Sequence, residues 1–148
     1  MNDNRQNSVM WMQHALKLAR RAACEGEVPV GACAWVDGVC VGEGWNQSIQ
    51  TCDPTAHAEI IALRAAAETL GNYRLTDVTL VVTLEPCLMC IGALQHARIQ
   101  HLIYGAPDLK QGALSNYAEV VQPSFSVESD VLSQVSAQLL RSFFKARR

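Results

Sequence analysis

Long apolar runs are missing from this sequence, and so is a strong excess of either charge. No run approaches the roughly 18 apolar residues that a membrane-spanning helix requires, and the polar residues 1–9 lack the apolar segment of a signal peptide. We therefore expect a cytoplasmic protein with no membrane partner. A net charge of −2 provides no overall field to attract nucleic acid, so any RNA-binding site should be small and local.

Internal repeats, low-complexity linkers and a second Cys-x-x-Cys pair are also absent. The 148 residues have globular composition, 49% hydrophobic and 18% charged, and we predict a single domain over residues 1–148. The six cysteines are most simply interpreted as reduced. Four of them have no metal-ligand spacing and are interpreted as core or incidental thiols, although the last lies close in sequence to His57: Cys24, Cys33, Cys40 and Cys52.

Two short stretches carry the residues of a catalytic zinc site, His57-Ala58-Glu59 and Pro86-Cys87-Leu88-Met89-Cys90. Cysteines three apart at the start of a helix share one face, and the amide groups there favour the thiolate form that binds metal. One His and two Cys can hold a zinc ion while a fourth position stays open for water. We predict that His57, Cys87 and Cys90 bind one Zn²⁺ per chain.

Glu59 follows the predicted His ligand by two residues. On a regular helix such a pair points roughly 200° apart, so both can face one pocket only if a helix begins here. Asp53 and Pro54 offer a capping side chain and a first-turn proline for a helix over residues 58–70, with His57 in its first turn. Two thiolates already balance the ion's charge, so Glu59 is predicted to carry protons between water and substrate.

Other interpretations of these residues exist. The Cys pair could be a redox dithiol or half of a structural zinc cluster, and His57 or Glu59 alone could be an ordinary surface residue. The joint pattern, His-x-Glu followed by Pro-Cys-x-x-Cys, favours a catalytic zinc site. A zinc-stabilised interaction module without enzymatic activity is the alternative from another class.

The rest of the chain alternates between strand and helix patterns. Helices are predicted over residues 9–24, 58–70, 86–96 and 130–145, and strands over residues 28–36, 39–45, 78–84, 99–105 and 125–127. Asp37-Gly38 predicts a tight antiparallel hairpin between the first two strands. Later strands should pair in parallel through right-handed crossovers, which gives an α/β fold with a mixed five-stranded sheet and helices on both faces.

The zinc pattern resembles the signature of the cytidine deaminase superfamily, and more closely that of bacterial tRNA-specific adenosine deaminases. The similar stretches cover most of the chain: Trp11-Met12, Glu27-Val28-Pro29-Val30-Gly31-Ala32, Gly42-Glu43-Gly44-Trp45-Asn46, Asp53-Pro54-Thr55-Ala56-His57-Ala58-Glu59-Ile60, Asn72-Tyr73-Arg74-Leu75, Val82-Thr83-Leu84-Glu85-Pro86-Cys87, Tyr104-Gly105-Ala106 and Ser142-Phe143-Phe144. The resemblance implies a three-layer α/β/α cytidine-deaminase-like fold, a homodimer, and hydrolytic deamination of adenosine to inosine at the wobble position of a tRNA anticodon stem-loop.

The resemblance also implies roles for individual residues. An activated water would attack C6 of a flipped adenine while Glu59 takes its proton, protonates N1 and helps ammonia to leave. Substrate contacts are implied for Asn46, Val28, Pro29, Val30, Ala58, Asp108, Lys110, Phe144 and Arg147. Phe144 and Arg147 belong to a basic tail with Lys145 and Arg148 that could stack on bases and contact phosphates. Without the resemblance, Asn46 would be interpreted as a turn residue and residues 28–30 as strand core. Asp108 and Lys110 would be interpreted as an exposed loop, and the basic tail as a solvated helix end.

Residues 121–125 depart from the family, whose members usually carry a longer loop with an Asn-His pair there. Gln47 and Gln111 also stand where basic and hydroxyl residues are common. None of these differences involves the metal ligands or Glu59, so they affect the expected docking of RNA and leave the predicted deamination intact. A deaminase of free nucleobases or nucleosides, of the guanine or cytosine type, shares the metal pattern and is the alternative function.

Overall fold

One mixed sheet forms the centre of the structure, a computed structural model that describes residues 3–147. Within these residues five strands follow the order β2-β1-β3-β4-β5. Strand β1 (Gly31–Val36) is antiparallel to β2 (Val39–Trp45) and to β3 (Thr79–Leu84), while β4 (His101–Ala106) and β5 (Ser126–Glu128) continue in parallel from β3. The expected mixed five-stranded sheet is confirmed. Arg148 of the predicted basic tail lies outside the described residues.

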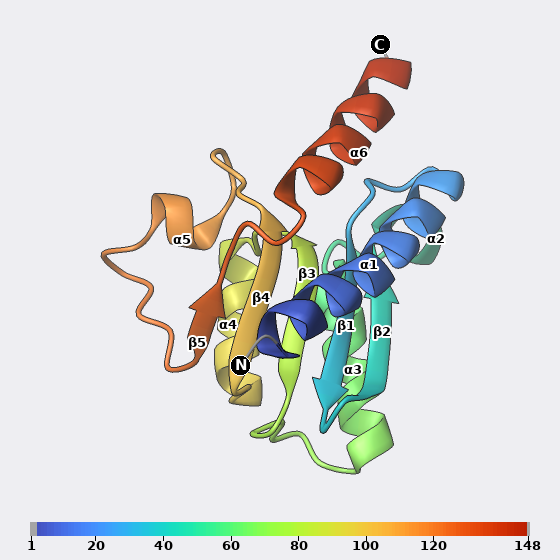
Figure 1. Ribbon diagram of the computed structural model, residues 1–148. Coiled ribbons are helices and arrows are strands. Elements are labelled where there is room, and N and C mark those ends of the chain that lie inside the picture. The colour runs from blue at the N-terminus through green and yellow to red at the C-terminus, as the bar shows by residue number, and fades with distance from the viewer. Residues whose placement is uncertain (1–2, 148) are drawn as a thin grey trace.

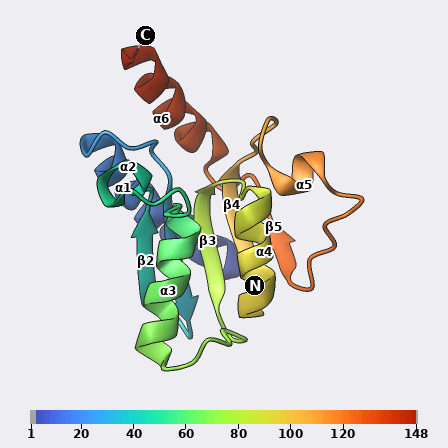
Figure 2. The same cartoon turned by 180° about the vertical axis from the view of Figure 1, so that it is seen from behind.

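Helices cover both faces of this sheet (Figures 1 and 2). Helices α1 (Asp3–Cys24) and α6 (Ser133–Ala146) lie on one face, and α3 (Ala58–Leu70) and α4 (Leu88–Ala97) lie on the other. Alternate residues of the strands therefore enter two separate apolar clusters, since Val81 and Ile103 pack toward α1 whereas Leu80 packs toward α3 and α4. The predicted three-layer α/β/α fold is confirmed.

Several element boundaries differ from the predictions. Strand β1 begins at Gly31 and not at residue 28, because Pro29 has no N–H and the N–H of Val30 donates to the Val28 carbonyl at 2.8 Å. Helix α1 begins earlier than predicted, at Asp3. Short helices α2 (Ser48–Thr51) and α5 (Ala113–Asn116) occupy segments in which neither a helix nor a strand was predicted.

The β1–β2 hairpin has a tight turn and a β-bulge. Asp37 and Gly38 have φ angles of 49° and 76°, which fits the turn predicted from the Asp-Gly pair. Further along, Ala34 pairs with Gly42 and Trp35 pairs with Cys40, so Val41 has no partner in the register. This extra residue changes which side chains of β2 point to each face of the sheet.

Helix α3 packs directly on the backbone of β2 through two glycines. A Cβ atom at Gly44 would lie 2.3 Å from the Ala58 carbonyl oxygen and 2.6 Å from the Ala62 nitrogen. At Gly42 a Cβ atom would lie 2.5 Å from the Ala62 carbonyl oxygen. The start of α3, which follows His57, is therefore held close to the end of the sheet.

Replacing Gly44 by Ala is expected to destabilise the protein by about 1–3 kcal/mol, because the added methyl group would force the helix away from the strand. Urea denaturation measures this free energy. Gly92→Ala on α4 is the matched control, since its Cβ meets nothing within 4 Å and the helix propensity of alanine should stabilise it by up to about 1 kcal/mol. Equal stability of the two variants would contradict the proposed contact.

Across the described helices, none combines the length and the apolar character that a bilayer span needs.

Candidate active site

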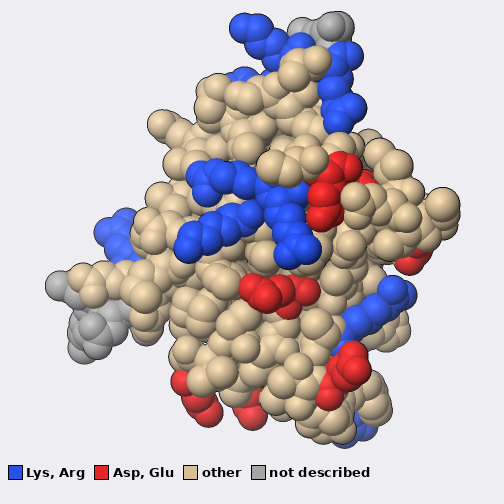
Figure 3. Space-filling model, turned by 90° about the vertical axis from the view of Figure 1, so that its right-hand side faces the viewer, with Lys and Arg blue, Asp and Glu red and all other residues tan. Residues whose placement is uncertain are grey.

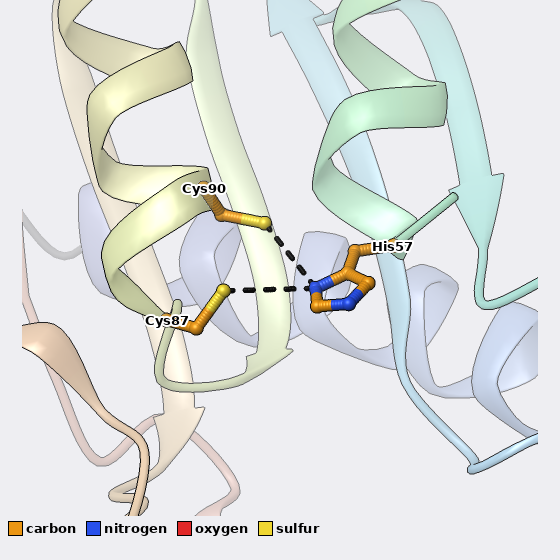
Figure 4. A group of neighbouring side chains, drawn as sticks. All are labelled: His57, Cys87 and Cys90. Carbon is orange, nitrogen blue, oxygen red and sulfur yellow. Dashed lines mark hydrogen bonds between the residues drawn. The ribbon is translucent and has the colours of Figure 1, made fainter. Parts of the chain in front are cut away.

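The predicted metal ligands meet at the N-terminal ends of α3 and α4 (Figure 4). His57 and Cys87 are the N-cap residues of these helices, and Cys90 lies in the first turn of α4. The placement differs slightly from the prediction, in which His57 and Pro86 stood in a first turn. Both cap residues have extended backbone conformations, and the three side chains point toward one another across the gap between the helices.

The distances between the donor atoms fit a tetrahedral zinc ion. Nδ1 of His57 lies 3.6 Å from Sγ of Cys87 and 3.6 Å from Sγ of Cys90. Bonds of about 2.0–2.1 Å to nitrogen and about 2.3 Å to sulfur at tetrahedral angles would separate these atoms by about 3.6 Å. The cluster of mutually close ligand atoms contains these three residues and does not include Glu59. The donor set therefore suits one Zn²⁺ per chain.

The pKa values of the two cysteine thiols shift in opposite directions. Hydrogen bonding from Cys90, with a further contribution from His57, lowers the pKa of the Cys87 thiol to about 4. The same bond to Cys87, together with burial, raises the pKa of Cys90. Cys87 is thus a thiolate before any metal arrives, and a bound cation would replace the proton held by Cys90.

Glu59 is buried in the first turn of α3, with 4% of its surface exposed. Burial raises the pKa of its carboxyl group to about 7, and the negative charge of Cys87 adds to this effect. The thiol of Cys90 lies close enough to Glu59 to affect this pKa. A carboxyl group with a pKa near neutrality can both accept and donate a proton during a reaction.

Asn46 fixes the start of α3. Its Oδ1 accepts a hydrogen bond of 2.9 Å from the Ala58 N–H, which leaves its NH₂ group to donate elsewhere. The sequence suggested Asp53 as the cap, and this was wrong. Asp53 instead accepts bonds from the N–H and the hydroxyl of Thr55, so its carboxylate is used within its own turn.

A cavity of about 330 Å³ opens beside His57. It is lined by Gly26, Glu27, Val28, Asn46, Ser48, Ile49, His57, Phe143 and Arg147. Three predicted contacts, Val28, Asn46 and Arg147, therefore meet at one site. Phe143 lines this cavity as well, although the sequence directed attention to its neighbour Phe144.

The other predicted contacts lie in different surroundings. A groove of about 800 Å³ is lined by Lys110, Leu140, Arg141, Phe144, Lys145 and Arg147. Pro29 and Val30 are buried, and Val30 belongs to the apolar core. Asp108 accepts hydrogen bonds from the N–H groups of Lys110 and Gln111, so its carboxylate shapes the loop that carries Lys110.

Two buried glutamates, neither of them predicted as a site residue, form hydrogen bonds to the loops beside the site. Glu27 is 2% exposed and accepts bonds of 3.2 and 2.9 Å from the N–H groups of Ile49 and Gln50. Glu85, also 2% exposed, accepts bonds from the N–H of Asp108 and from the N–H and hydroxyl of Ser115. The sequence shows only that Glu27 directly precedes one predicted strand and that Glu85 directly follows another, and their role becomes apparent only from these tertiary contacts.

The family model for the cytidine and deoxycytidylate deaminase zinc-binding region matches residues 5–106. Together with the fold and the His/Cys/Cys donor set, this match defines the protein as a zinc-dependent hydrolytic deaminase. The chain is 48% identical over 143 residues to a tRNA-specific adenosine deaminase of Haemophilus influenzae, with 93% of this chain and 83% of that protein covered. It belongs to the tRNA-specific adenosine deaminase family.

The chain also resembles solved structures of deaminases. A structure from a study of A-to-I editing by tRNA:A34 deaminases at the wobble position of transfer RNA superimposes with a TM-score of 0.85. That chain is 42% identical, and the match covers 88% of this chain and 99% of that one. A guanine deaminase structure from Bacillus subtilis is 34% identical with a TM-score of 0.64, covering 78% of this chain and 71% of that one.

Proposed function

We propose that this protein converts adenosine to inosine at the wobble position of a tRNA anticodon loop. The observation that carries the proposal is that Arg147 lines both the cavity beside His57 and the groove lined by Lys110 and Phe144. A flipped base fits the cavity, while neighbouring nucleotides can use the cations and the aromatic ring of the groove. Figure 3 shows Lys and Arg side chains gathered, with Asp and Glu side chains beside them, on the side that lies at the right of Figure 1, although the net charge of the chain is −2.

The chemistry depends on Glu59. When bound, zinc acidifies a water molecule that would otherwise be a poor nucleophile at neutral pH. Glu59 lies next to Cys90 and can take a proton from that water, deliver it to N1 of the adenine, and pass a second proton to the departing amino group. The water oxygen forms its bond to C6 as its first proton leaves, the proton remaining on this oxygen passes through Glu59 to the amino group, the C6–N6 bond breaks and ammonia leaves. The side chain of Asn46 is oriented by the hydrogen bond from the Ala58 N–H to its Oδ1, and its NH₂ group can donate to the nucleoside.

We further infer that residues 1–148 act as one domain in a cytoplasmic homodimer. A single sheet joins the two apolar clusters, which favours one cooperative unit. Leu88 and Met89 are 48% and 38% exposed next to Cys87, and a second copy of the chain would cover them. Crosslinking or sedimentation tests the dimer, and a monomer at micromolar concentration would contradict it. A cytoplasmic location brings the enzyme to its tRNA substrate.

A deamination assay that measures released ammonia, with inosine identified by nucleoside analysis of the stem-loop, decides the substrate class. Zinc-loaded protein is incubated with an anticodon stem-loop carrying a wobble adenosine, with the same stem-loop carrying guanosine there, and with free adenosine, guanine and cytosine. We expect turnover of the wobble adenosine alone. The guanine deaminase likeness makes free guanine the strongest competitor, and turnover only of free bases or nucleosides would overturn the proposal.

Two substitutions at Asn46 separate its structural and its binding role. Asp keeps the oxygen that accepts from the Ala58 N–H but lacks the amide donor, so kcat/KM for the stem-loop should fall at least about tenfold with stability unchanged. Ala loses both functions, and its free energy of unfolding should also fall by about 1 kcal/mol. Full activity of Asn46→Asp would show that the NH₂ group does not contact the substrate.

A further inference from the structure

A second group of side chains of the types that bind metals lies on the α1 face of the sheet, on the side opposite α3 and α4. It consists of His14 on α1 and of Cys40 and Glu43 on β2, whose ligand atoms all lie within 4.8 Å of one another. Nε2 of His14 is 2.5 Å from Oε2 of Glu43. The His14 and Glu43 side chains are 35% and 47% exposed and Cys40 is half-buried, so solvent and ions can reach the group.

The β-bulge at Val41 creates this group. In a regular strand Cys40 and Glu43 would point to opposite faces, because they are an odd number of residues apart. Here Cys40 pairs with Trp35 and Glu43 pairs with Cys33, and those two residues of β1 share the face toward α1. Val41 and Gly42 both point toward α3 instead. Bulges recur in proteins where a side chain must be re-aimed, often beside a functional site.

We propose that His14, Cys40 and Glu43 bind a divalent transition-metal ion of the zinc class, in addition to the ion held by the deaminase site. One nitrogen, one sulfur and one oxygen donor, with water at the fourth position, suit such an ion, and the thiolate disfavours Mg²⁺ and Ca²⁺. A thiolate and a carboxylate also balance a charge of +2. The site stands independently of the proposed deaminase function.

Metal binding requires two small changes at this site. The His14–Glu43 separation would widen from 2.5 Å to about 3.3 Å, the spacing of nitrogen and oxygen around tetrahedral zinc. Glu43 can accommodate this shift because its side chain is about half exposed on an edge strand. Burial raises the pKa of Cys40, and the nearby Glu43 charge adds to this, so the ion must displace a proton from its sulfur. Both costs make the site weaker than the deaminase site.

Two tryptophans next to the group provide an intrinsic signal. The rings of His14 and Trp35 are 5.7 Å apart and nearly perpendicular, and Trp11 stacks on Trp35 at 5.1 Å. A paramagnetic ion bound to His14 would therefore quench tryptophan fluorescence. The same ion bound to Cys40 would give a thiolate-to-metal absorption band. Metal binding at this site can therefore be followed by fluorescence quenching and by absorption, without an activity assay.

The experiment titrates Co²⁺ into zinc-loaded, full-length protein under a non-thiol reductant. Co²⁺ binds N, O and S sites more weakly than Zn²⁺ and so should leave the deaminase site occupied. We expect one further equivalent to bind, with the absorption band and quenching rising together. His14→Gln, Cys40→Ser and Glu43→Gln should each weaken this binding more than about tenfold without changing the rate of deamination.

Cys24→Ser is the matched control, because Cys24 is an exposed thiol on α1 outside the group, and it should leave the titration unchanged. Loss of the signal in Cys24→Ser, or absence of a second equivalent in the unmodified chain, would overturn the proposal. Glu43→Gln preserves the shape of an exposed side chain and carries the test if Cys40→Ser fails to fold. Undiminished Co²⁺ binding in Glu43→Gln and His14→Gln would also overturn it.

Discussion

Glu59→Ala is expected to abolish inosine formation while the protein stays folded and keeps its zinc. The carboxyl group is buried beside Cys90 but lies outside the cluster of ligand atoms, so its removal leaves the metal donors intact. Proton transfer by a positioned side chain contributes about 10²–10⁴ in rate, and we expect a loss of that size in single-turnover assays. Glu59→Gln should lose as much activity, because it keeps the shape of the side chain but cannot carry the proton.

Glu68→Ala serves as the control for this experiment, since Glu68 is an exposed residue of the same helix. Its activity should equal that of the unmodified protein. Zinc content is measured in parallel for every variant. A Glu59→Ala protein that still deaminates at the normal rate would rule out Glu59 as the proton carrier, and one that has lost its zinc would indicate that Glu59 supports the metal.

Cys90→Ala is expected to remove both the tightly bound zinc and the activity. Cys90 is buried and its sulfur is one of three donors, so two residues would remain to hold the ion. We expect zinc affinity to fall at least about 100-fold and inosine formation to fall to background in metal-buffered solution. Equilibrium dialysis followed by elemental analysis measures the first effect.

Cys52→Ala is the comparison for Cys90→Ala, because Cys52 is an exposed thiol that lies outside the cluster despite its closeness to His57 in sequence. This variant should retain zinc and activity. Removing the metal from the unmodified protein with a chelator and restoring it should switch deamination off and on. Activity that survives in Cys90→Ala after complete metal removal would contradict the metal-dependent reaction.

The zinc ligands could be predicted from the sequence because the information is local. Cys87 and Cys90 are three residues apart at a helix start, and the helix after His57 begins at the predicted residue, Ala58. The alternation of apolar strands and helices likewise predicts the three layers. These features depend on spacing along the chain, which a single sequence displays directly.

The contacts that hold the site together could not be predicted, because they join distant segments. Asn46 caps α3 from twelve residues away, and this displaced the local candidate Asp53. Glu27 and Glu85 look like ordinary acidic residues until the loops they bind are in place. The sequence also did not predict the group formed by His14, Cys40 and Glu43. A regular strand pattern assigns Cys40 and Glu43 to opposite faces of the sheet, whereas the bulge at Val41 places them on the same face.

Helix α6 extends away from the sheet (Figure 1), and within it Ser136 is the buried residue. At its far end, the Arg147 guanidinium donates to the Gly26 carbonyl at 3.2 Å and stacks over the Phe143 ring. So little apolar burial should let this helix open at a lower free energy than the strands, and its amide hydrogens should exchange first. On gentle warming, the RNA contacts proposed for Phe144 and Arg147 should therefore be lost before zinc is released.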